Sequence, residues 1–173
     1  MGREVRMVPP DWQPPTYFGK DWRTNMPDLR FRSLLAGGFD AALGDWKENK
    51  AAWDRGEVRD WTTGGWKPKV GDEGTFEEWH GGEPKRENYM PDFAPGTATH
   101  LMMFETTSEG SPISPAFATP EELARWLADN NASAFAGEGA TYEEWLRVCQ
   151  GGYAPSAIIS DGVIQSGVAG LTP

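Results

Sequence analysis

The chain has 173 residues, of which 38% are hydrophobic, with 21 glycines, 14 prolines and a formal net charge of -10 at pH 7. This length favours one domain with a sizeable core, and the glycine and proline content favours many turns. No apolar run approaches the roughly 20 residues that span a bilayer, and no signal-peptide core follows the first residues, so we expect a cytoplasmic protein without membrane contacts. The single cysteine, Cys149, excludes an internal disulfide and fits a reducing compartment.

Charge is distributed unevenly along the chain. Residues 1–69 contain 12 Lys and Arg against 10 Asp and Glu, a net of +2, whereas residues 70–173 contain 4 against 16, a net of -12. An acidic surface of this size is repelled by nucleic acid and membranes and attracts basic partners, although acidity also simply keeps small proteins soluble. We therefore predict a single domain, 1–173, in which 1–69 is a near-neutral arm plus helix rich in Pro and Trp, and 70–173 is an acidic α+β core.

The first segments are extended. Residues 3–8 predict a short strand, because the two prolines that follow stop any helix. Residues 11–27 contain three prolines and four aromatic residues, which indicates an irregular arm laid over the body and pinned by its rings. A proline-rich ligand for a partner groove is the alternative, but the segment lacks repeated Pro-x-x-Pro spacing.

Residues 40–55 have helical periodicity. Trp46 and Trp53 belong to an apolar stripe at spacings of three, four and seven, which is typical of a packing face. Gly56 is a plausible stop for this helix. Residues 61–68 then predict a Trp-rich loop, whose rings could either pack or bind a ligand.

Three further helix starts follow. The near copies at residues 75–79 and 141–145 each predict a capping box, in which a threonine hydroxyl and a glutamate three residues later satisfy backbone N–H groups. Thr119 precedes a proline at the favoured first helical position, and Leu123, Trp126 and Leu127 form the expected buried stripe of that helix. The last helix is expected at about 142–149.

The remaining elements are strands. Residues 99–106 alternate so that both faces of a central strand are covered. Residues 157–160 and 163–166 flank Asp161-Gly162, a strong hairpin pattern. Together the elements predict an α+β fold: a small antiparallel or mixed sheet with three to four helices and long Pro/Trp-rich loops.

No set of residues amounts to a catalytic, cofactor or metal site. His80, His100 and Cys149 lack the clustering that zinc requires, and neither a phosphate-binding loop nor a nucleophile elbow occurs. Cys149 is expected to be a buried thiol. Glu105 and Glu109 are the acids least explained by structure, so they are either part of a ligand site or of a plain polar turn.

Several stretches resemble a known group of proteins. They are Gly-Arg-Glu-Val-Arg at 2–6, Tyr-Met-Pro-Asp at 89–92, and the long run 105–115 that continues through Phe-Ala-Thr-Pro-Glu-Glu-Leu-Ala at 117–124. In these stretches the chain resembles a family of small uncharacterised accessory proteins of tailed bacteriophages and prophages. The match is poor over about 20–75, where the proteins are expected to differ in what they contact. The resemblance implies phage origin and brings no established activity or catalytic residue.

The preferred hypothesis is a phage accessory protein that is not an enzyme and that binds and blocks a host protein. The expected target is an anti-phage defence protein that handles nucleic acid. Its acidic region would compete with phosphates for a basic surface, without contacting nucleic acid itself. The carboxylates expected to make this contact are Glu77, Glu78, Glu83, Glu87, Glu105 and Glu109.

Three alternatives stay open. A sponge for a nucleotide signal would need a basic pocket, for which Arg23, Arg30 and Arg32 are candidates. A small hydrolase would use Glu105 or Glu109. A minor virion component would need no such site.

Overall fold

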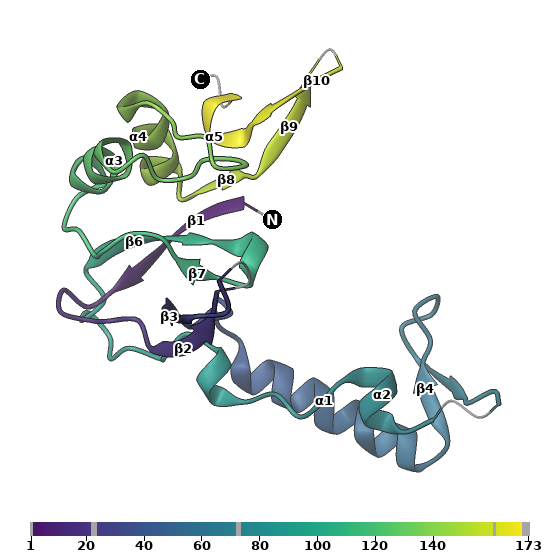
Figure 1. The fold of residues 1–173 in the computed structure, drawn as a ribbon. Coiled ribbons are helices and arrows are strands. Elements are labelled where there is room, and N and C mark those ends of the chain that lie inside the picture. Colours follow the sequence, from purple (N-terminus) through teal and green to yellow (C-terminus); the bar gives the residue numbers. More distant parts are fainter. Residues whose placement is uncertain (1, 22–23, 72–73, 161, 171–173) are drawn as a thin grey trace. The chain divides into compact units, whose positions relative to one another are not determined.

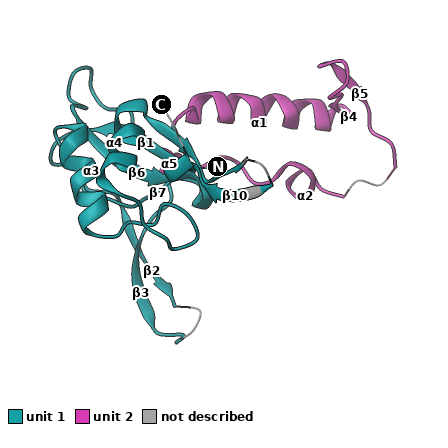
Figure 2. Ribbon diagram, turned by 90° about the horizontal axis from the view of Figure 1, so that it is seen from above, with its two compact units in different colours: residues 1–36, 91–173 teal, residues 37–90 magenta. Residues whose placement is uncertain are grey.

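The computed structural model describes residues 2–21, 24–71, 74–160 and 162–170 (Figure 1). The chain separates into two compact units (Figure 2). Unit 1 comprises residues 1–36 and 91–173, and unit 2 comprises residues 37–90. This division does not follow the charge boundary at residue 69, because the first strands pair within the same unit as the acidic C-terminal elements.

Unit 1 contains a four-stranded sheet in the order β7-β6-β1-β8 with helices beside it. Its elements are β1 (Gly2–Val8), β2 (Thr16–Lys20), β3 (Pro27–Phe31), β6 (His100–Glu105), η2 (Thr106–Ser108), β7 (Ser111–Pro112), α3 (Pro120–Asp129), α4 (Tyr142–Gly151), β8 (Tyr153–Pro155), β9 (Ala157–Ser160), β10 (Val163–Ser166) and α5 (Gly167–Gly170). Every strand pairing in the described part of the chain is antiparallel. The predicted α+β fold is therefore confirmed.

The core of unit 1 lies between the sheet and two helices. Met103 of β6 packs with Leu123 and Leu127 of α3 and with Trp145 and Val148 of α4, and all five side chains are buried. Met102 and Phe104, which alternate with Met103, are buried on the opposite face. The prediction that both faces of this strand are covered, with a neighbour on each side, is confirmed.

Capping explains where the helices of unit 1 begin. The Thr119 and Thr141 hydroxyls each accept a hydrogen bond from the backbone N–H three residues on, at 3.2 and 3.3 Å. Glu122 and Glu144 return the bond to the N-cap backbone, which completes both boxes. Gly152, with φ of 83°, ends α4 in the left-handed conformation that glycine adopts without strain.

Unit 2 is built around one long helix and one short helix. Its elements are α1 (Phe39–Asp54), β4 (Glu57–Arg59), β5 (Trp66–Pro68), α2 (Phe76–His80) and η1 (Arg86–Asn88). Trp53, Val58 and Phe76 form its small core, with Trp46 packed against them. The predicted helix at 40–55 and the packing role of its tryptophan stripe are confirmed.

Two predictions about irregular segments are wrong. Residues 11–27 do not form an arm pinned by its rings, because 16–20 and 27–31 pair as the hairpin β2–β3. Its prolines stand before the hairpin or at a strand end, where no ladder hydrogen bond is lost. Trp12 does pack, with its ring 5.6 Å from that of Phe93, but Phe18 is 78% exposed. Trp22 lies outside the described residues.

The Trp-rich loop at 61–68 is the second correction. Its last residues form β5, which pairs with β4 as a second hairpin that ends in an ordered turn. Asp60 holds this turn together, because its carboxylate accepts hydrogen bonds from the Thr62 N–H at 3.1 Å and the Thr63 hydroxyl at 2.8 Å. The third hairpin, β9–β10, is confirmed, although Asp161 of its turn lies outside the described residues.

Candidate functional site

The six glutamates predicted to bind a partner divide between the two units. Glu77, Glu78, Glu83 and Glu87 belong to unit 2, whereas Glu105 and Glu109 flank the η2 turn of unit 1. Glu77, Glu83, Glu87 and Glu109 are exposed. The six carboxylates therefore fall into two groups, four in unit 2 and two in unit 1.

Glu78 has a structural role that explains its presence. Its carboxylate accepts hydrogen bonds from the Thr75 N–H at 2.8 Å and the Thr75 hydroxyl at 3.0 Å. These bonds favour the ionised form and hold the pKa of Glu78 below its ordinary value. The Glu78 side chain therefore caps α2, and this role accounts for its carboxylate.

Glu105 also has a structural role, as the ion-pair partner of Arg3. Its carboxylate lies 2.9 Å from Nη1 of Arg3, whose side chain is only 4% exposed. Arg3 also donates from Nε to the Ser133 carbonyl at 2.8 Å. Beside this ion pair, the Thr107 and Ser156 hydroxyls meet at 3.1 Å and line a cavity of about 160 Å³ with it. A buried guanidinium needs this carboxylate as a partner, so Glu105 is explained by stability.

The basic residues proposed for a nucleotide pocket do not form one in the described residues. Arg23 lies outside them, and Nε of Arg30 lies 3.0 Å from the Asp28 carboxylate. Arg32 is half-buried at the base of the hairpin, where its backbone N–H donates to the Pro15 carbonyl at 2.8 Å.

Cys149 is buried in the core of unit 1, as predicted. Burial, with a smaller contribution from the Glu121 charge, raises the pKa of its thiol to about 12. A thiol with this pKa carries almost no thiolate at neutral pH and is a poor nucleophile. Within the described residues, no group of three or more His, Cys, Asp and Glu side chains could hold a metal ion.

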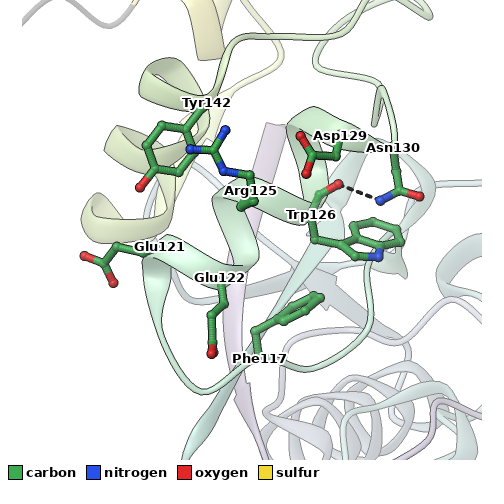
Figure 3. Close-up of a pocket in the computed structure, with 8 residues that line it drawn as sticks. All are labelled: Phe117, Glu121, Glu122, Arg125, Trp126, Asp129, Asn130 and Tyr142. Carbon is green, nitrogen blue, oxygen red and sulfur yellow. Dashed lines mark hydrogen bonds between the residues drawn. The ribbon is translucent and has the colours of Figure 1, made fainter.

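A pocket that the sequence analysis missed lies along α3 (Figure 3). Its volume is about 520 Å³, and its lining residues are Phe117, Glu121, Glu122, Arg125, Trp126, Asp129, Asn130 and Tyr142. We call it the aromatic–acidic pocket. Three carboxylates against one guanidinium give its lining a formal net charge of -2. Because oppositely charged groups attract, this pocket favours a cation.

The guanidinium of this pocket is already engaged. The Arg125 Cζ atom lies 3.9 Å above the centre of the Tyr142 ring, in a cation–π contact (Figure 3). Glu122 caps α3, whereas Glu121 and Asp129 are exposed and form no ion pair with any cation in the described ranges. The pocket thus has carboxylates whose charge is unbalanced locally.

Trp126 forms a wall of a second pocket. This pocket has a volume of about 340 Å³ and is lined mainly by apolar groups, from Gln13, Pro14, Phe31, Met102, Ile113, Ser114, Pro115, Ala116 and Trp126. We call it the apolar pocket. Trp126 was expected within the buried stripe of α3, but it is only partly buried, unlike Leu123 and Leu127. The spacing Glu122, Trp126, Asp129 was the available signal, since residues three and four apart share a helix face.

Phe31 connects the apolar pocket with the β2–β3 hairpin. The pairs Phe18–Leu29 and Thr16–Phe31 alternate with Tyr17–Arg30, so Phe18, Leu29 and Phe31 share one face of the hairpin. These three side chains are 78%, 58% and 50% exposed. An apolar face of this kind on a two-stranded ribbon is typical of an interaction surface.

No helix in the described ranges is both long and apolar enough to cross a membrane. Comparisons with protein-family models, with curated proteins and with solved structures found no match to this chain.

Proposed function

We propose that this chain is a phage accessory protein that acts in the host cytoplasm by binding and blocking a host protein with a basic surface. The observation that carries the proposal is the surface charge of residues 70–173. Most acids of this region are exposed, and only four basic residues offset them. Such a surface accelerates encounter with a basic partner and competes with phosphates for it.

The resemblance to phage accessory proteins supports the host-directed role, and the state of the candidate catalytic groups supports a role in binding. Glu105 pairs with Arg3, and Cys149 is a buried thiol. The aromatic–acidic pocket does not favour a nucleotide sponge, because carboxylates outnumber cations in its lining and repel phosphate.

The test is a tagged pull-down from bacterial host lysate, washed at low and at high salt, with bound proteins and small molecules both identified. We expect a stoichiometric partner with a basic nucleic-acid-binding surface that high salt releases. A copurified nucleotide without a protein would contradict the proposal in favour of a sponge, and copurification with virus particles would favour a virion component.

A charge-reversal variant sharpens this test. It leaves the helix cap Glu78 in place and replaces the other four exposed glutamates of the predicted set by lysine: Glu77→Lys, Glu83→Lys, Glu87→Lys and Glu109→Lys. The matched control reverses four exposed acids of residues 1–69, namely Asp11, Asp40, Asp45 and Glu48, which changes the net charge equally. Loss of the partner in the first variant alone supports the proposal, and equal retention by both would sink it.

A further inference from the structure

The three features described above form one continuous surface within unit 1. Phe31 belongs to the apolar face of the β2–β3 hairpin and also lines the apolar pocket. Trp126 lines both the apolar pocket and the aromatic–acidic pocket. An exposed apolar strip therefore leads to an apolar cavity, which shares a wall with an acidic cavity.

We propose that this surface binds an extended peptide segment of a basic partner protein, in which a large apolar side chain is followed by Lys or Arg. The apolar side chain occupies the apolar pocket, and the basic side chain enters the aromatic–acidic pocket. This assignment rests on the proposed function and adds to it a site and a recognition chemistry that the six predicted glutamates do not supply.

The sizes of the pockets suit these occupants. The apolar pocket, at about 340 Å³, is in the range that holds a compact ligand group and is lined by Pro14, Phe31, Met102, Ile113 and Trp126. Its buried polar side chain is satisfied internally, because the Ser114 hydroxyl accepts from the Met103 N–H at 2.9 Å and donates to the Pro115 carbonyl at 2.8 Å. Filling the pocket with an apolar group therefore leaves that hydroxyl paired.

Charge selects the basic residue. Glu121 and Asp129 are exposed carboxylates of the pocket lining, which also contains Trp126, with Phe117 tilted against the indole at a ring separation of 6.1 Å. In Figure 3 Asp129 lies between Trp126 and the guanidinium of Arg125, whereas Trp126 lies on the side of the pocket away from the Arg125–Tyr142 pair. A Lys or Arg side chain there gains a carboxylate partner and an aromatic face together.

The same charges disfavour other occupants. A second copy of this chain carries a net charge of -10 and an identical acidic pocket, so self-association through this face is opposed by repulsion. A phosphate-bearing ligand meets three carboxylates. A neutral apolar segment fits the hairpin and the apolar pocket only, and leaves the carboxylates unused.

The probes are three synthetic pentapeptides with blocked ends: Gly-Phe-Lys-Arg-Gly, Gly-Ala-Lys-Arg-Gly and Gly-Phe-Gln-Gln-Gly. Each is titrated to millimolar concentration into the full ¹⁵N-labelled chain, and the Trp126 indole N–H and the Ile113 and Ala116 amides are followed by NMR. We expect saturable shifts at all three positions with the first peptide, and binding at least about fivefold weaker with the other two.

Two variants locate the binding. Phe31→Ser should weaken the first peptide about tenfold, whereas the control Ile164→Ser, on the exposed β9–β10 hairpin, should leave affinity unchanged. The double change Glu121→Gln and Asp129→Asn should weaken it about fivefold, with a loss of salt dependence, whereas Glu138→Gln with Glu143→Gln should not.

Four results would overturn the assignment: no shift with any peptide, equal binding of the neutral peptide, equal weakening by the control variants, or a dimer of the free chain that Phe31→Ser dissolves. The pull-down separates this outcome from failure of the proposed function. A salt-released host partner that survives the Phe31 and Glu121/Asp129 variants refutes the site alone. Peptide binding without any host partner refutes the function alone.

Discussion

Two parts of unit 1 carry apolar side chains at regular spacing, and only one of them buries these side chains. In the α3–α4 layer, Leu123, Leu127, Trp145 and Val148 have no exposed surface. In the β2–β3 hairpin, Phe18, Leu29 and Phe31 share one face, and each is at least 50% exposed to water. The comparison shows that the spacing of apolar residues predicts which side chains share a face of a helix or strand. Whether that face is buried depends on which other elements of the chain pack against it.

The sharpest way to break this comparison is to truncate one leucine in each part. Leu127→Ala should lower the free energy of unfolding by about 3 kcal/mol, because it removes a fully buried side chain and leaves a cavity. Leu29→Ala, at a position 58% exposed, should change it by less than about 0.5 kcal/mol. Urea unfolding followed by circular dichroism measures both, and a similar loss in the two variants would show that the hairpin face is covered.

A smaller effect is expected at the ion pair of β1 and β6. Glu105→Gln should lower the free energy of unfolding by about 1–2 kcal/mol, because the buried Arg3 guanidinium loses its charged partner. Glu109→Gln, four residues on and exposed, serves as the matched control and should be neutral. If both variants unfold at the same urea concentration as the parent, Glu105 is free for another role and the hydrolase hypothesis regains ground.

Capping supplies the next contrast. Thr119→Ala should cost about 1 kcal/mol, because the N–H of Glu122 loses the hydroxyl that caps α3. Thr16→Ala, at an exposed position of the hairpin, should stay within about 0.5 kcal/mol of the parent. Thermal unfolding of the two variants at one pH compares them, and an unchanged midpoint for Thr119→Ala would refute the stabilising role of this capping box.

The smallest effect is expected at Cys149, and it is measured by the rate at which a thiol reagent labels this residue. Since burial raises the pKa of this thiol to about 12 from an ordinary value of 9.0, the folded chain should resist a thiol reagent at pH 8 and react at once in urea. Between about pH 9 and 12 the Cys149 thiol stays protonated in the folded state and is ionised in the unfolded state. The free energy of unfolding should therefore fall as the pH rises from about 9 towards 12. Rapid labelling of the folded protein at pH 8 would contradict this burial.

The comparison also explains what the sequence predicts well. The capped helices at Thr119 and Thr141, the strand at 100–105 and the hairpin at 157–166 depend on local patterns, and all are present. Residues 16–31 were missed because proline content argues against strands unless the prolines fall at strand ends. The partial exposure of Trp126 was missed for a different reason. Its exposure depends on where Pro14, Phe31 and Pro115 lie around it, which no helical spacing specifies.

The place of β1 in the sheet has a consequence for the order of assembly during synthesis. Arg3 pairs with Glu105 on one side and with Ala154 on the other, so β1 is made long before either of the strands that it pairs with. All of unit 2 emerges before either partner does. Until β6 is made, both edges of β1 are unpaired in the nascent chain. An unpaired strand can pair with other chains, so β1 needs protection, such as that of a chaperone, during synthesis.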